Sequence, residues 1–322
     1  MSSAGVDRGF RRVSARPPAP AGAPRARGNL RFWPQYVAVS PFFLLFAAFG
    51  LFPVGFSAWL AFHRWDGISP VTFAGLEQFR FLAEDATFRK AVVNTLVIWV
   101  LSTVPMLIAS LAIASLLNSV RRFKTFYQVV LFLPSVTSIV AIAIFFKAIF
   151  NNQVGLVNQV LTAIGLPAVE WLNGWWTIKI VLALLMTWQW VGYNAIIYFA
   201  GLQAIPGEVY EAAKIDGAGA LRTFWSITVP MLRPVILFTV VISTITGLQT
   251  FAEPQVLFGS NAAVNPNSGG PGQAGLTMVL YFYQQAFNNN NYGYGAAIAY
   301  AVLAIVGVFA LVNWRLVARS EK

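Results

Sequence analysis

The chain has 322 residues, of which 57% are hydrophobic and only 10% are charged. Because soluble globular proteins carry roughly 25% charged residues, this composition argues against a soluble enzyme and indicates a protein of the lipid bilayer. The lack of cysteine excludes disulfides, thiolate metal sites and cysteine nucleophiles, and a single histidine, His63, excludes histidine-based metal clusters.

The first segment, residues 1–35, is rich in Arg, Pro and Ala, with the run RPPAPAGAPRAR beginning at Arg16. Its apolar content is too low to form a core, so we predict a disordered basic cytoplasmic tail. Residues 36–318 are predicted to form one transmembrane domain. The last residues, 319–322, are predicted to be a short cytoplasmic end.

Six apolar runs are each long enough to cross about 30 Å of hydrocarbon, which takes roughly 20 helical residues. The backbone must satisfy its own hydrogen bonds inside a membrane, so we predict an all-α integral membrane protein with six transmembrane helices. The runs lie at residues 36–62, 91–117, 126–150, 178–202, 234–258 and 293–317.

The distribution of Lys and Arg predicts the orientation of the spans. Sixteen of the 22 basic residues lie in the tail, in the second and fourth loops and at the C-terminus, and the other six lie on the opposite side. Both termini are therefore predicted to be cytoplasmic. The net charge of +11 is then explained by topology, and no nucleic-acid partner is expected.

Two loops on the opposite, outer side differ in composition. The 64–90 loop carries apolar side chains at Phe79, Leu82 and Phe88 among mixed charges, which predicts a short amphipathic helix at the membrane interface. The 259–291 stretch has no charge and is dense in Gly, Asn and Pro, which predicts a loop by turn chemistry.

A polar stretch, residues 204–233, separates the fourth and fifth spans. Pro206 and Glu208 suit the first turn of a helix, and Gly217 supplies the left-handed conformation that ends one. A second helix is predicted from near Ala218 towards Pro230. The stretch should therefore form a compact helical elbow, and an ordinary amphipathic interfacial loop is the alternative interpretation.

The spacing within this stretch is specific. Read from Glu211, it is Glu-Ala-Ala, three residues, Gly217, nine residues, Ile227, one residue, Val229 and Pro230. It resembles the cytoplasmic coupling loop of the membrane subunits of binding-protein-dependent ATP-binding-cassette importers, with Val229 in place of the usual leucine. The resemblance implies that the elbow docks on an ATPase subunit through Tyr210, Glu211, Ala212, Ala213, Asp216, Gly217, Ile227 and Pro230.

Other segments extend this resemblance to the first membrane subunit of sugar importers in the maltose and glycerol-phosphate permease group. They are PFFLLFAAFGLFPVGFSAWLAF from Pro41, FRKAVVNTL from Phe88, LFLPSVTSIV from Leu131 and the GGP at 269–271. The resemblance implies a type I importer permease fold in a bacterial-type inner membrane. It also implies four kinds of partner: a second homologous permease, an ATPase dimer, an extracytoplasmic solute-binding protein and a sugar.

The chain itself is not expected to be an enzyme. It has no GxxxxGK[ST] motif and no Gly-Lys dipeptide, so it lacks the usual loop that cradles nucleotide phosphates. No cofactor or metal is expected here, and the resemblance implies that ATP and Mg are bound by the partner ATPase.

A sugar path needs hydrogen-bonding groups and aromatic faces inside the bundle. Within the fifth span, Thr246, Gln249, Thr250 and Glu253 follow one another at i, i+3, i+4 and i+7, which predicts one continuous polar stripe. Hydrogen bonds that merely hold helices together are the alternative role. The candidate solute-path residues are Trp188, Gln189, Tyr193, Asn194, Thr246, Gln249, Thr250 and Glu253.

Two other function classes compete with an importer subunit. A stand-alone secondary carrier or channel would usually hold several buried ionisable residues in its spans, and these spans hold little beyond Glu253. A membrane enzyme would need a nucleophile, base or metal cluster that the sequence does not contain. The identity of the sugar stays open.

Overall fold

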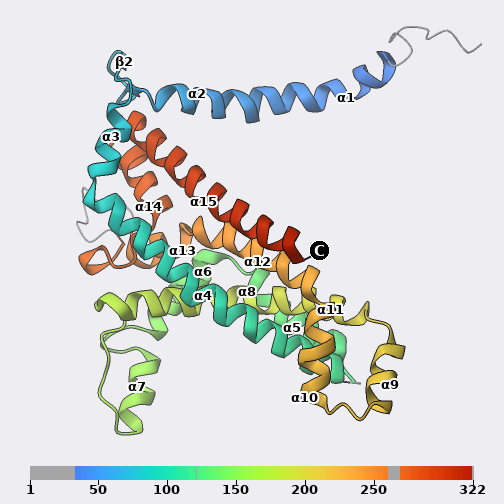
Figure 1. Ribbon diagram of the computed structural model, residues 1–322. Helices are drawn as coiled ribbons and strands as arrows, with labels where there is room; N and C mark the ends of the chain where they lie inside the picture. The colour runs from blue at the N-terminus through green and yellow to red at the C-terminus, as the bar shows by residue number, and fades with distance from the viewer. Residues whose placement is uncertain (1–32, 121, 260–268, 321–322) are drawn as a thin grey trace, which may run out of the picture. The chain divides into compact units, whose positions relative to one another are not determined.

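The computed structural model describes residues 33–120, 122–259 and 269–320 (Figure 1). The chain divides into two units, residues 1–54 and 55–322. Most of the predicted disordered tail lies outside the described residues. Its last three positions do not, and they are helical, because the first helix, α1, begins at Trp33.

The described elements are almost all helical. In chain order they are α1 (Trp33–Phe46), a π-helical turn (Ala47–Leu51), α2 (Phe52–Leu60), β1 (His63–Arg64), β2 (Thr72–Phe73), α3 (Glu77–Glu84), α4 (Ala86–Ser119), α5 (Lys124–Val136), α6 (Ile139–Ile149), α7 (Leu156–Ala163), α8 (Trp175–Gln203), α9 (Gly207–Ile215), α10 (Ala220–Thr223), a π-helical turn (Phe224–Thr228), α11 (Val229–Met231), α12 (Arg233–Leu248), α13 (Ala252–Phe258), a 3₁₀ turn (Pro271–Gln273), α14 (Met278–Tyr283), a π-helical turn (Gln284–Asn288) and α15 (Tyr292–Ser320).

Five stretches of helix in the described part are long and apolar enough to cross a membrane, and a bent pair makes a sixth. They confirm the predicted number of spans when the pair counts as one. The five are Gln35–Leu60, Ala86–Ser119, Trp175–Gln203, Arg233–Phe258 and Tyr292–Arg315.

The third predicted span, 126–150, is not one straight helix. It consists of α5 and α6, which meet at an angle of 91°. Thr137, at the C-terminal end of α5, has an extended backbone (φ −76°, ψ 144°). Pro134 lies one turn before it and has no N–H to give to the helix, which weakens the last turn of α5.

Helix α8 packs against both α4 and α5 in the second unit, and α4 and α8 cross near its centre in Figure 1. A Cβ atom at Gly192 of α8 would lie only 1.7 Å from the backbone oxygen of Leu131 in α5. Glycine at this position therefore lets the two backbones approach closely.

A small hairpin follows α2. Its strands β1 and β2 are antiparallel, with His63 opposite Phe73. The helix predicted in the same loop is present as α3, and its apolar Leu82 is buried. The hairpin was not predicted, because a strand of two residues leaves no alternating pattern in the sequence.

The prediction of a loop over 259–291 is wrong for most of its described part. Residues 269–278, called the strap from here on, enter the core, where Ala274, Leu276 and Met278 are fully buried. Helix α14 and a π-helical turn follow. Residues 260–268 lie outside the described residues.

Two side chains of α4 hold the strap in place. The Asn94 Nδ2 atom donates to the backbone oxygens of Gln273 and Leu276, at 2.8 and 3.1 Å. The hydroxyl of Thr95 accepts the N–H of Met278 at 2.9 Å. Polar residues of an apolar span thus satisfy the backbone of an irregular segment that would otherwise be buried without partners.

Candidate functional site

The fifth span is broken where its polar residues lie. Helix α12 ends at Leu248 and α13 begins at Ala252. Between them Phe251 has non-helical backbone angles (φ −138°, ψ −54°). The predicted continuous helical stripe is therefore wrong, since its third member, Thr250, lies in the break and its fourth, Glu253, lies in a different helix.

The break nevertheless brings these residues to one cavity of about 510 Å³. Six of the eight predicted solute-path residues line it. They are Tyr193, Asn194, Thr246, Gln249, Thr250 and Glu253.

The other two predicted residues, Trp188 and Gln189, do not line this cavity. The Trp188 ring instead packs against Phe146 of α6, with ring centroids 5.9 Å apart. Gln189 is buried, and its Oε1 atom accepts no hydrogen bond from the described residues. Both residues were predicted because they lie near Tyr193 and Asn194 along the chain, and proximity along the chain does not separate the faces of a helix.

Three hydroxyl residues that line the cavity were not predicted from the sequence. Ser102 and Thr103 come from α4 and Ser243 from α12. A hydroxyl in a transmembrane helix usually bonds to its own backbone, as Ser102 does to the oxygen of Trp99 at 3.1 Å. Only the packing of α4 against α8 and α12 reveals that these side chains reach a cavity.

The chemistry of the cavity suits a polyhydroxylated ligand. It offers hydroxyls, the amides of Asn194 and Gln249, and the rings of Trp190 and Tyr193, which meet edge to face at 5.9 Å. Glu253 is the only charged residue of the lining, and it lies in the first turn of α13, where the helix dipole favours a carboxylate. Alternating polar groups and aromatic faces match the hydroxyls and C–H faces of a sugar.

The predicted elbow is present between α8 and α12. Its first arm is α9, which follows Pro206 directly. The arm ends at Gly217 with φ +72°, and the N–H of Ala218 returns to the oxygen of Ala213 at 2.9 Å. The sequence prediction of a glycine-terminated helix followed by a second one is confirmed.

The second arm consists of α10, a π-helical turn and α11. A hydrogen bond joins the two arms, between the hydroxyls of Tyr210 and Thr228 at 3.3 Å. Ala213 is buried within the elbow. Ile227 is half-buried, whereas Glu211, Ala212, Asp216 and Pro230 are exposed.

The elbow carries large apolar side chains on its surface. Ile215, Leu221 and Trp225 are 87%, 76% and 62% exposed. In Figure 1 the elbow lies at the opposite end of α8 from α7. Exposed apolar groups gathered on a projecting segment are typical of a surface that another protein covers.

The sequence matches a known family and is similar to named members of it. Residues 95–317 match the family described as binding-protein-dependent transport system inner membrane component. The chain is 35% identical to the arabinooligosaccharides transport system permease protein of Halalkalibacterium halodurans, over 89% of this chain and 88% of that protein. It is 34% identical to the lactose transport system permease protein of Rhizobium radiobacter, over 89% of this chain and 94% of that protein.

The fold is also similar to that of a solved structure. A chain of a bacterial ABC transporter involved in the import of the acidic polysaccharide alginate superposes with a TM-score of 0.77 at 24% sequence identity. The match covers 91% of this chain and 98% of that one. This likeness confirms the predicted fold class.

Proposed function

Because this chain belongs to the family of binding-protein-dependent transport system inner membrane components, we propose that it is the permease subunit of an ATP-driven carbohydrate importer. It forms half of the solute path and couples that path to ATPase subunits in the cytoplasm. The observation that carries the proposal is the cavity, in which residues of α8 and of the broken fifth span converge.

The connections of the elbow support the coupling role. Its first arm continues from α8, which bears Tyr193 and Asn194, and its second arm leads into α12, which bears Thr246. At its base the buried Leu232 packs in one cluster with Tyr198 of α8. A displacement of the elbow therefore moves two walls of the cavity together, as a rigid-body transition requires.

A neutral saccharide is the best match for the cavity. Its lining contains no Lys or Arg, and its one charged residue is the acidic Glu253. The named relatives transport arabinooligosaccharides and lactose. An anionic sugar would meet no positively charged side chain in this lining.

The partners follow from this role. A second permease completes the path, and an ATPase dimer that binds ATP and Mg covers the exposed apolar residues of the elbow. A sugar-loaded binding protein docks at the other end of the bundle; the similar alginate transporter has been solved in complex with a saccharide-bound periplasmic protein. The elbow and both termini lie in the cytoplasm. A stand-alone carrier would have no use for the elbow's exposed Ile215, Leu221 and Trp225.

Substitution of Gly217 tests the coupling role. Gly217→Val places a β-branched residue at φ +72°, which costs about 1–2 kcal/mol, while the space around it is open. We expect sugar uptake to fall roughly tenfold, with the permease still present in the membrane. Glu211→Lys should act likewise by disturbing the docking surface.

Gly219→Val is the matched control, because Gly219 has φ −67° and equally open surroundings. Uptake of radiolabelled sugar and ATP hydrolysis would be measured in vesicles that contain the whole transporter. Undiminished uptake in both Gly217→Val and Glu211→Lys would refute the coupling role.

A further inference from the structure

A second cavity, of about 590 Å³, lies away from the solute path and the elbow. It is called the outer cavity here and is formed by the hairpin region, α3 and the residues before α15. Its volume falls within the range of about 300–1,000 Å³ typical of small-molecule sites. Its lining comprises Arg64, Trp65, Asp66, Ser69, Pro70, Thr72, Glu77, Gln78, Phe81, Asn289, Asn290 and Asn291.

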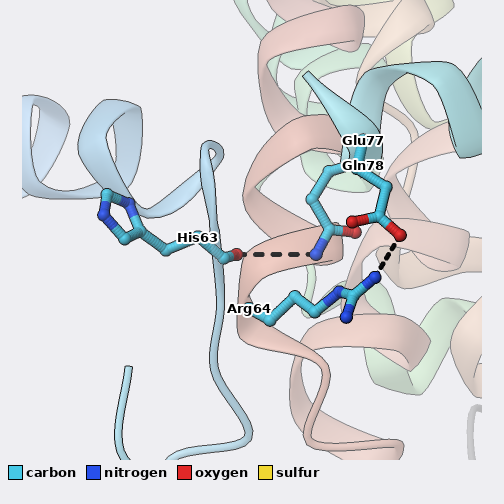
Figure 2. Close-up of polar contacts among 4 residues, drawn as sticks. All are labelled: His63, Arg64, Glu77 and Gln78. Atoms are coloured by element: carbon cyan, nitrogen blue, oxygen red, sulfur yellow. Dashed lines mark hydrogen bonds and ion pairs between the residues drawn. The ribbon is translucent and has the colours of Figure 1, made fainter. Parts of the chain in front are cut away.

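The walls of the outer cavity are bonded to one another. The N–H of Tyr292 donates to the oxygen of Trp65 at 3.0 Å. A Cβ atom at Gly293 would lie 2.0 Å from the oxygen of His63, so only glycine permits this approach of α15 to the hairpin. Figure 2 shows that the Gln78 amide of α3 reaches the same His63 oxygen, at 3.5 Å. The cavity is therefore held in shape without a ligand.

The charged side chains of the lining form bonds with other groups of the protein. Arg64 forms an ion pair with Glu77 (Figure 2). The carboxylate of Asp66 accepts the N–H of Ile68 and both the hydroxyl and the N–H of Ser69, and these bonds lower the pKa of Asp66 to about 2. An ionic ligand would have to break these pairs, so a neutral ligand is favoured.

Several amides of the lining keep unused hydrogen-bonding capacity. Gln78 is only 8% exposed, and its Oε1 accepts no hydrogen bond from the described part of the chain. Asn290 adopts a left-handed backbone, φ +52°, and its side chain forms no hydrogen bond with the described residues. An amide is both a donor and an acceptor, which suits hydroxyl groups.

Two aromatic rings complete the lining. Trp65 packs against Tyr292 at 5.5 Å between ring centroids, and Phe81 packs edge-on against Tyr294 at 4.9 Å. Phe81 nevertheless remains 56% exposed. Rings held by such contacts offer apolar faces at little entropic cost.

We propose that the outer cavity is a second saccharide site, which binds a neutral sugar separately from the membrane cavity. This inference rests on the proposed function, because that function supplies the class of ligand. The geometry contributes paired charges, unused amides and fixed aromatic faces at one place. A sugar bound here would be held on the permease before it enters the solute path.

The test uses the whole transporter in lipid nanodiscs without binding protein, so that the binding protein's own sugar site is absent. Binding of lactose and of arabinotriose would be followed by saturation-transfer difference NMR. Phe81→Leu and Asn290→Gly each remove one ligand contact, and glycine tolerates the φ of Asn290. We expect the dissociation constant of the sugar at the outer cavity to rise roughly tenfold in each variant.

Phe73→Leu is the matched control, because Phe73 is an exposed ring of the same hairpin that does not line the cavity. Unchanged affinity in Phe81→Leu and Asn290→Gly, combined with loss of binding in Gln249→Leu, would overturn the outer site and leave the proposed function intact. Unchanged affinity with loss of ATPase stimulation by the binding protein would instead identify the cavity as a protein docking site and refute the saccharide site. If the complete system took up neither lactose nor arabinotriose, that result would count against the proposed carbohydrate function.

Discussion

The carboxylate of Asp85 joins three helices through its two oxygen atoms. Its Oδ1 atom accepts the N–H of Thr87 at 2.7 Å and so caps α4. Its Oδ2 atom accepts the hydroxyls of Tyr281 in α14 and Tyr294 in α15, both at 2.5 Å. Burial alone would raise the pKa of Asp85, but the hydrogen bonds from the two tyrosines and the backbone outweigh it and hold the pKa below its usual value.

Asp85→Asn should destabilise the protein at neutral pH. An asparagine has one acceptor oxygen where the carboxylate has two, so either the cap or the tyrosine contacts are lost, at about 1.5–3 kcal/mol for a hydrogen bond to a charged group. The stability from ionised Asp85 is complete above the unfolded pKa of about 3.9 and is lost as the pH falls through the lower folded pKa. Thermal unfolding in detergent from pH 7 down to pH 3 would measure it.

Glu84→Gln is the control for this comparison. Glu84 lies next to Asp85, but its ion pair with Arg80 is exposed and worth little. The difference in unfolding temperature between wild type and Asp85→Asn should become smaller towards pH 3. A difference in unfolding temperature that stays constant from pH 7 to pH 3 would show that the charge of Asp85 does not contribute to stability.

Single residues were predicted well where a local pattern defines them. Gly217 was recognised because helices commonly end on a glycine in the left-handed conformation. Ser102 and Gln78 were not recognised as cavity residues, because their neighbours come from distant parts of the chain. A side chain's role in a cavity depends on contacts that no local spacing contains.

At the scale of helices, the apolar runs predicted the spans within a few residues, because the bilayer sets their length. The bend between α5 and α6 and the break at 249–251 were not predicted. Both interrupt runs that remain apolar or helical in composition, so the sequence carries no sign of them. At the break, the hydroxyl of Thr277 donates to the oxygen of Thr250 at 2.7 Å.

Thr277→Val tests whether this hydroxyl holds the break. The hydroxyl also accepts the N–H of Leu280 and so caps α14, which means that valine leaves two buried backbone groups unpaired. An unpaired buried group costs about 1–3 kcal/mol, so we expect the uptake rate to fall roughly tenfold. Thr277→Ser keeps the hydroxyl and should retain near-normal uptake. Equal uptake by the valine and serine variants would contradict this role.

At the scale of the whole chain, the charge distribution predicts that the hairpin and the elbow lie on opposite sides of the membrane. The chain has no cysteine, so single introduced cysteines report cleanly. Ile68→Cys, at a position 92% exposed, should react with an impermeant maleimide in right-side-out vesicles. Ile215→Cys, in permease expressed without ATPase subunits, should react only in inside-out vesicles.

The parent chain should remain unlabelled in both kinds of vesicle. Reaction of both cysteines on the same side would refute the arrangement of the spans, and reaction with the sides exchanged would reverse the orientation.

The strap also affects the order in which the molecule is built during synthesis. Its hydrogen bonds to Asn94 and Thr95 join residues 179 to 183 positions apart. The ribosome therefore completes the first five spans while the side-chain amide of Asn94 still lacks these partners. Closing so long a loop is slow and comes late. This end of the bundle consequently acquires its native packing late, once the strap itself has been synthesised.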